Sequence, residues 1–170
     1  MATDTPRPTT VMTVDPPTGE YLSVVGDTYR IIMGAKQTDG AFAAIDMFIP
    51  PKGGPGPHAH AQIEETFYVI DGEVVVKSET QTYTAKQGAF VRIPRGGAIH
   101  SFHNETDKVA HLLCVVIPAG LEEMFEEIGK PVQPSTFLPP PPMTPEAQKH
   151  MQEVATKYGQ EVFPPDYLGN

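Results

Sequence analysis

Three histidines and one glutamate have the types and the spacing of a metal site. His58 and His60 stand two residues apart, Glu65 follows soon after, and His100 comes much later in the chain. Imidazole nitrogens and a carboxylate oxygen are ligands that divalent first-row metals accept, and a position left open on the ion is typical of a catalytic site. The sequence therefore predicts one metal centre, provided the fold brings both segments together.

The alternation of a β-strand decides which of these side chains can share a face. Residues two apart point to the same side, so His58 and His60 can both face inward. Glu65 is out of phase with this pair, and its use as a ligand requires a bulge or a bend across residues 61–64. Once a strand resumes, Glu64 points to the opposite face, and it remains the alternative carboxylate ligand.

The last ligand depends on a turn in the second half of the chain. Residues 94–97 read Pro-Arg-Gly-Gly, a turn that lets His100 enter the interior at the start of a strand. Asn104, at the far end of that strand, can satisfy backbone groups there. The second segment is therefore expected to present His100 to the first.

Short strands at close spacing must position these residues. Gly and Pro punctuate the chain between them, and residues 50–57 are too rich in proline to join a ladder. This pattern favours an all-β sandwich or barrel. The strands that we expect cover residues 29–33, 43–49, 65–70, 73–77, 81–85, 89–93, 99–103 and 109–117.

The character of the chain changes after residue 118. Apolar residues at helical spacing predict a helix over residues 121–128, which Gly129 ends. Thr144 with Pro145 behind it predicts a second helix, capped by the threonine and reaching about residue 158. We therefore expect three parts: an N-terminal arm (1–17), a barrel (18–118) and a helical C-terminal extension that packs on the barrel (119–170).

Composition restricts the partners and the setting. The net charge of −9, from 12 Lys and Arg against 21 Asp and Glu, argues against binding to nucleic acid or to anionic membranes. No segment approaches the roughly 20 apolar residues that span a bilayer, and the first residues lack the pattern of a secretory signal. The single cysteine, Cys114, lies in an apolar run and is expected to be an inert buried thiol. We expect a cytoplasmic protein.

Two motifs resemble those of the cupin superfamily. The first is Gly53…His58-x-His60-x₄-Glu65-x₆-Gly72, and the second is Gly88-x₅-Pro94-x-Gly96-x₃-His100-x₃-Asn104. The resemblance implies a jelly-roll barrel, or double-stranded β-helix. It also implies one divalent transition metal ion (Fe, Mn, Ni, Co, Cu or Zn), held by His58, His60, Glu65 and His100. The spacing to Gly72 selects Glu65 over Glu64.

Three segments are similar to small single-domain cupins of the quercetin dioxygenase type: residues 38–42, 55–60 and 118–129. This resemblance implies a metal-dependent dioxygenase that acts on a flavonol-like or other small enol or phenol. Glu65 is then the proton acceptor. Aromatic residues on the strands are candidates to line the substrate cavity, although such residues are also ordinary core: Phe67, Phe90 and Phe102.

Two other classes of function carry the same motifs. One is a non-enzymatic cupin that binds a small ligand, and the other is an isomerase or epimerase of sugars. The chain has no obvious cluster of Lys and Arg near the motifs for a phosphorylated sugar, which disfavours the isomerase. Barrels of this kind expose sheet edges, and the N-terminal arm can pair across two subunits, so we expect a homodimer.

Overall fold

The computed structural model describes residues 7–169, which form three helices and twelve strands. The helices are α1 Ala35–Thr38, α2 Leu121–Ile128 and α3 Pro145–Lys157. The strands are β1 Glu20–Val24, β2 Asp27–Met33, β3 Ala43–Ile49, β4 His58–His60, β5 Glu64–Asp71, β6 Glu73–Ser78, β7 Thr82–Lys86, β8 Phe90–Ile93, β9 His100–His103, β10 Ala110–Ile117, β11 Lys130–Pro131 and β12 Gln160–Val162. All eight strands expected from the sequence are present, with ends within two residues of the predicted ones.

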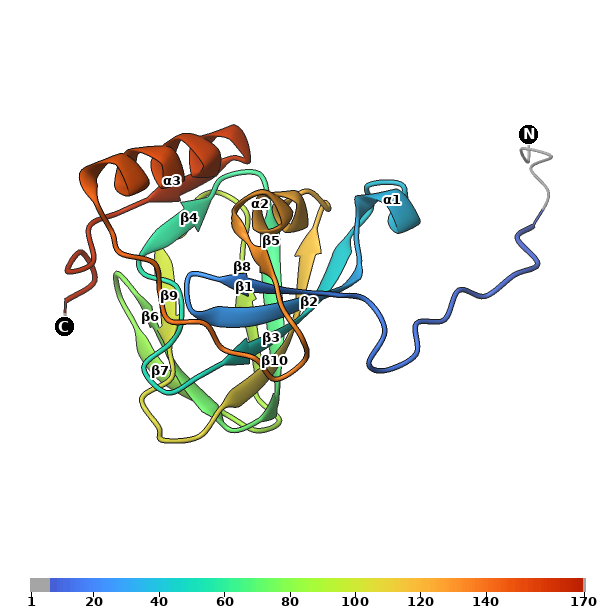
Figure 1. The fold of residues 1–170 in the computed structure, drawn as a ribbon, viewed down its shortest axis with the longest axis horizontal. Coiled ribbons are helices and arrows are strands. Elements are labelled where there is room, and N and C mark those ends of the chain that lie inside the picture. The colour runs from blue at the N-terminus through green and yellow to red at the C-terminus, as the bar shows by residue number, and fades with distance from the viewer. Residues whose placement is uncertain (1–6, 170) are drawn as a thin grey trace.

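Two antiparallel sheets form the jelly-roll barrel (Figure 1). One sheet has the strand order β11-β1-β2-β3-β10-β5-β8, and the other has the order β12-β4-β9-β6-β7. Along β10, Leu112, Cys114 and Val116 are fully buried while the residues between them are partly exposed. This alternation supplies the apolar interior between the sheets, as expected when one face of a sheet packs on a core. The predicted all-β barrel is confirmed.

The chain crosses from one sheet to the other between β4 and β5. His60 ends β4 in the five-stranded sheet, and Glu64 begins β5 in the seven-stranded sheet. At the crossing, the backbone N–H of Gly96 donates a hydrogen bond to the carbonyl of Ala61 at 3.0 Å. The bend predicted across residues 61–64 is therefore real, and it is a change of sheet. Because β5 faces β4 across the interior, Glu65 can point back at the histidines.

The C-terminal extension contains both predicted helices. α2 covers the predicted residues, and Thr144 caps α3 by accepting a hydrogen bond from the backbone N–H of Ala147 at 3.2 Å. α3 lies across the end of the barrel next to β4 (Figure 1). Val154 and Ala155 of α3 are buried. These two residues join the hydrophobic core of the barrel.

Two strands of the extension were not predicted. β11 pairs with β1 at the edge of one sheet, and β12 pairs with β4 at the edge of the other. They have two and three residues, too few for the alternation on which a prediction depends. They can be identified as strands only from their pairing with distant strands. The extension thus adds one strand to each sheet.

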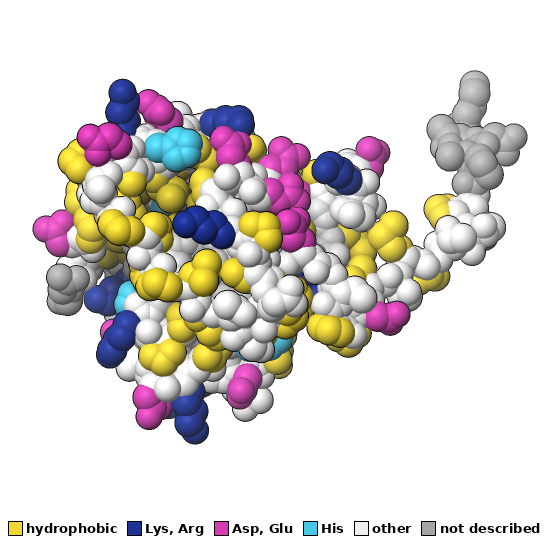
Figure 2. Space-filling view, in the orientation of Figure 1, with side chains coloured by type: hydrophobic (Ala, Val, Ile, Leu, Met, Phe, Trp, Pro, Cys, Tyr) yellow, Lys and Arg dark blue, Asp and Glu magenta, His cyan; other side chains and the backbone are white. Residues whose placement is uncertain are grey.

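The predicted N-terminal arm is without helix or strand over its described residues, 7–17, and residues 1–6 lie outside the described part of the chain. This segment leads away from the barrel, and hydrophobic side chains are visible along it (Figures 1 and 2). Val11 is 88% exposed and Met12 is 58% exposed. Within residues 7–169, no helix is both long and apolar enough to cross a membrane.

Candidate metal centre

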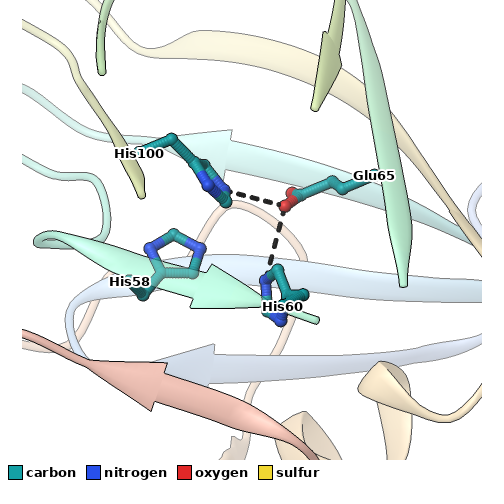
Figure 3. Close-up of side chains that lie close together, drawn as sticks. All are labelled: His58, His60, Glu65 and His100. Atoms are coloured by element: carbon teal, nitrogen blue, oxygen red, sulfur yellow. Dashed lines mark hydrogen bonds and ion pairs between the residues drawn. The ribbon is translucent and has the colours of Figure 1, made fainter. Parts of the chain in front are cut away.

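The four predicted ligands meet inside the barrel. Each of His58, His60, Glu65 and His100 offers a nitrogen or oxygen atom, and these atoms all lie within 4.8 Å of one another. All four side chains point into one space from three strands, β4, β5 and β9 (Figure 3). None of the four is more than 7% exposed. The fold therefore brings both motif segments to one point.

Backbone carbonyls orient two of the histidines. The Nδ1 atom of His58 lies 2.8 Å from the carbonyl oxygen of Gly56, and that of His100 lies 2.9 Å from the carbonyl oxygen of Ala98. A carbonyl can only accept, so each Nδ1 carries the proton. The Nε2 of neutral His58 then presents a lone pair. The Nε2 of His100 donates a hydrogen bond to Oε2 of Glu65 at 3.2 Å, and it must lose this proton before it can bind a metal. Such support of ring orientation is usual for histidines that bind metals.

His60 is the member of the cluster that lacks any hydrogen bond. Its side chain is 1% exposed, and its Nε2 lies 3.5 Å from Oε2 of Glu65 without hydrogen-bonding geometry. In the described part of the chain, Nδ1 and Nε2 of His60 are the only buried side-chain nitrogen or oxygen atoms without a partner. An unpartnered buried polar atom is costly, so a ligand that binds one of these nitrogens would recover part of that cost. The residues present fit a cation.

The ionisation of the cluster also suits a cation. Burial, together with the nearby His100, lowers the pKa of His58 to about 3, so the ring is neutral with its lone pair free. Burial acts to raise the pKa of Glu65, but hydrogen bonding to His100 and the proximity of His60 hold it well below its usual range. Glu65 is therefore an anion at neutral pH. Neutral imidazole and an ionised carboxylate are the forms that coordinate metals.

The alternative ligand Glu64 is outside the cluster. Its carboxylate accepts two hydrogen bonds from Arg92, at 2.9 and 2.8 Å, on the outer face of β5. Adjacent residues of a strand face opposite sides, so only one of the two glutamates can point inward. The structure places Glu65 there, and the Glu64 alternative is wrong.

An apolar cavity of about 260 Å³ adjoins the cluster. His58 and Glu65 form part of its wall. The C-terminal extension forms another part, through residues of α2 and α3 and the segment after them. Six of these lining residues are Leu121, Met124, Phe125, Met151, Val162 and Phe163. A roof of this kind excludes water from whatever binds beside the cluster.

The three aromatic candidates have different environments. Phe102 lines the cavity. Phe67 is 1% exposed and packs against Phe102 with ring centroids 5.2 Å apart, but it does not reach the cavity wall. The prediction for Phe90 is wrong, because this side chain is 66% exposed on the edge strand β8 opposite Tyr68. The alternation of β8 turns Phe90 outward, which the sequence of a four-residue strand does not reveal.

Two other residues with reactive side chains, His111 and Cys114, lie outside the cluster. His111 points away from the cavity, with its Nε2 2.9 Å from Oδ1 of Asp46 and its ring stacked on Phe48. Cys114 is fully buried as expected, and its Sγ lies 3.6 Å from Oε1 of Glu65. Burial raises the pKa of this thiol well above its usual value. The thiol is thus a weak donor to the carboxylate.

Two ionisable residues of the cavity were missed by the sequence analysis. Asp27 and Tyr29 are each 4% exposed and line the cavity together with His58 and Glu65. Both lie on β2, two residues apart, so they share its inner face. The spacing was visible in the sequence, but only packing shows that this face meets the cluster.

Comparisons with known proteins agree with this architecture. Residues 45–116, which include all four cluster residues, match the family model described as a cupin domain. The quercetin 2,3-dioxygenase of Bacillus subtilis (strain 168) is 25% identical over 119 residues. That alignment covers 70% of this chain and 35% of the relative, so the chain spans about a third of that protein's length.

Solved structures share the fold at lower identity. A predicted oxalate decarboxylase from Thermotoga maritima has a TM-score of 0.58 at 20% identity, with 63% of this chain and 99% of that chain covered. A sugar phosphate isomerase of the cupin superfamily from Silicibacter pomeroyi has a TM-score of 0.56 at 20% identity, covering 64% and 77%. The polyketide cyclase RemF from Streptomyces resistomycificus has a TM-score of 0.56 at 17% identity, covering 88% and 99%. These similarities concern the fold alone.

Proposed function

This chain contains a cupin domain in residues 45–116, and from this premise we propose that the protein is a metal-dependent dioxygenase. Its substrate is a flavonol-like compound or another small enol or phenol. The similarity to a quercetin 2,3-dioxygenase supports this reaction class. The apolar cavity beside the cluster supports an uncharged, aromatic-compatible substrate.

The observation that carries the proposal is the state of His60. A fully buried ring with two unpartnered nitrogens, next to an ionised Glu65, would be stabilised by a cation between them. His58, His60, Glu65 and His100 would hold this ion. The donor set does not select among Fe, Mn, Co, Ni, Cu and Zn, because all accept imidazole and carboxylate.

A divalent ion held by these residues would supply Lewis acidity and so favour ionisation of a substrate hydroxyl group. Glu65 is the group that accepts the proton, because its carboxylate is ionised and forms part of the cavity wall. The thiol of Cys114 contacts Oε1 of Glu65 and the ring of His100 contacts Oε2, so both carboxylate oxygens have a neighbouring donor in this structure. The apolar roof keeps water from the substrate anion.

One observation weighs against a sugar phosphate isomerase. Among the described residues that line the cavity there is no Lys or Arg. A phosphate group buried there would lack the cations that usually bind it. A module that only binds an apolar ligand remains the main rival, because it needs the same walls.

Oxygen uptake tests the proposal. The purified protein is analysed for metal content and reconstituted with each candidate metal. It is then assayed with a panel of flavonols and diketones. We expect oxygen consumption that requires the metal. Turnover of any substrate without oxygen consumption would contradict the proposal, as would tight binding of the panel without turnover under any metal.

We also propose that the protein is a homodimer in which the N-terminal arm packs on the second copy. The exposed Val11 and Met12 support this, because apolar side chains on an extended segment gain most from being covered. Light scattering on the protein and on a Val11→Ser/Met12→Ser variant tests it. A dimer that the double variant weakens is expected, and a wild-type monomer contradicts the proposal.

A further inference from the structure

Asp27 differs from the other cavity residues because it carries a carboxyl group and lies outside the cluster of His58, His60, Glu65 and His100. It begins β2, is 4% exposed, and lines the same cavity as His58 and Glu65. Apolar side chains such as Met124 and Phe125 make up much of the remaining wall. A carboxyl group in such surroundings is expensive to bury, so its retention calls for a specific partner.

The partners that Asp27 has within the protein are few. The backbone N–H of Gly54 donates to its Oδ1 at 3.1 Å, and the hydroxyl group of Tyr29 donates to its Oδ2 at 3.3 Å. Within residues 7–169, no Lys, Arg or His forms an ion pair with it. Oδ1 therefore accepts a good hydrogen bond, whereas Oδ2 has one long contact and retains hydrogen-bonding capacity.

Burial raises the pKa of Asp27 to about 7, even though the hydrogen bonds from Gly54 and Tyr29 act in the opposite direction. At neutral pH and below, the group is therefore largely a carboxylic acid. A carboxylic acid has an O–H to donate, which a carboxylate lacks. The cavity then contains an acceptor, Glu65, and a donor, Asp27.

We propose that Asp27 is the polar recognition group of the cavity, and that its carboxyl group donates a hydrogen bond to an oxygen atom of an uncharged, apolar ligand. The ligand oxygen concerned is not the hydroxyl that faces Glu65. The ligand class is thus a compact apolar molecule with two separate oxygen functions. Tyr29 is a positioning residue, because its hydroxyl group holds Oδ2.

A simpler role for Asp27 would be to fix the loop before β4 through Gly54. The loop is closely packed at this glycine, because a Cβ on Gly54 would overlap the carbonyl oxygen of Phe102. Asp27→Asn separates the two roles, because the amide oxygen still accepts from Gly54 while the amide nitrogen donates at every pH. A fixing role alone does not make ligand affinity depend on the ionisation of residue 27.

Flavone is a suitable probe, because it has a carbonyl oxygen but no ionisable group and no hydroxyl for Glu65. Its dissociation constant is measured by titration calorimetry from about pH 6 to about pH 8.5, on protein whose metal content is known. If only the protonated form of Asp27 binds, the constant rises about thirtyfold over this range. In Asp27→Asn it changes less than about twofold.

The other ionisable groups that line the cavity with Asp27 are Tyr29 on its own strand, His58 on β4 and Glu65 on β5. Cys114 on β10 and His100 on β9 contact Glu65. The pKa of His58 and that of Glu65 lie below the range, while burial places those of Tyr29 and Cys114 well above their usual values. The pKa of His100 is raised by Glu65, against the effect of burial. His100 is present in both proteins, so the comparison with Asp27→Asn removes its contribution.

The inference rests on the proposed function only for the place where the ligand binds. An affinity for flavone that is independent of pH in the wild type would overturn it, as would the same pH dependence in Asp27→Asn. Failure to bind flavone at any pH would overturn it as well. Flavone is not turned over through Glu65, so a protein that shows the expected binding but consumes no oxygen with flavonols retains this inference and loses the proposed reaction.

Discussion

Glu64 and Glu65 are neighbours in β5 but occupy opposite sides of the sheet. Glu64 forms an exposed ion pair with Arg92, and Glu65 lies 3.2 Å from His100 inside the barrel. The two glutamates therefore form a matched pair for mutation, with the same residue type on the same strand and different surroundings.

Removal of the inner carboxylate should abolish activity. Glu65→Ala is expected to reduce oxygen uptake at saturating flavonol by at least about 10²-fold, because the proton acceptor is lost. The free energy of unfolding should change little, because the variant loses the contacts of the carboxylate but also the cost of burying it. Glu64→Ala loses only an exposed ion pair and should retain both activity and stability, because such pairs contribute little to folding. Equal activity of Glu65→Ala and wild type would contradict the role of Glu65.

Removal of a histidine ligand should release the metal. His100→Ala deletes the donor that β9 contributes, and the metal content measured by elemental analysis should fall well below that of the wild type. Even the loss of a group that supports a ligand weakens metal binding by about 10–100-fold. His103→Ala is the control, because His103 lies on the same strand with its side chain exposed. If both variants retain metal, the ion is elsewhere.

The stability of Asp27→Asn relative to wild type should depend on pH. The pKa of Asp27 is about 7 in the folded protein, against an ordinary value of 3.8. Between about pH 4 and pH 7 the unfolded chain has lost this proton and the folded protein has kept it, so wild-type stability falls as pH rises through this window. Asparagine does not titrate and avoids this loss.

The difference in unfolding free energy between Asp27→Asn and wild type should therefore grow in favour of the variant from pH 4 to pH 8. Its upper limit is on the order of 4 kcal/mol, from a shift of about three pKa units. Denaturant unfolding at several pH values measures it. A difference that stays constant with pH would mean that Asp27 titrates normally in the folded protein.

The C-terminal strand should be needed for metal binding. β12 pairs with β4, so that Gln160 lies opposite His60 and Val162 opposite His58. Proline at position 161 removes a backbone N–H from β12 and is poorly tolerated in a ladder. Glu161→Pro should therefore weaken metal affinity and lower the Tm, whereas Glu161→Ala should leave both nearly unchanged. Full metal affinity in the proline variant would show that β4 needs no support from β12.

Local patterns were sufficient for much of the fold. Alternation identified eight strands, Thr144 with Pro145 identified the start of α3, and the two motifs identified the four residues that meet in the cluster. These are properties of short segments, because side-chain direction in a strand and capping of a helix depend on neighbouring residues.

Eight strands, helices α2 and α3 and the ligand candidates followed from the sequence alone, whereas the cavity followed only from the packing of distant segments. Whether Phe90 is outside, whether Asp27 is inside, and whether the extension covers the cluster all depend on contacts between residues far apart in the chain. The same holds for β12, whose three residues form a strand only because β4 lies beside them. The alternation of side chains along a strand shows which residues share a face of the sheet. Tertiary packing decides which other residues that face contacts.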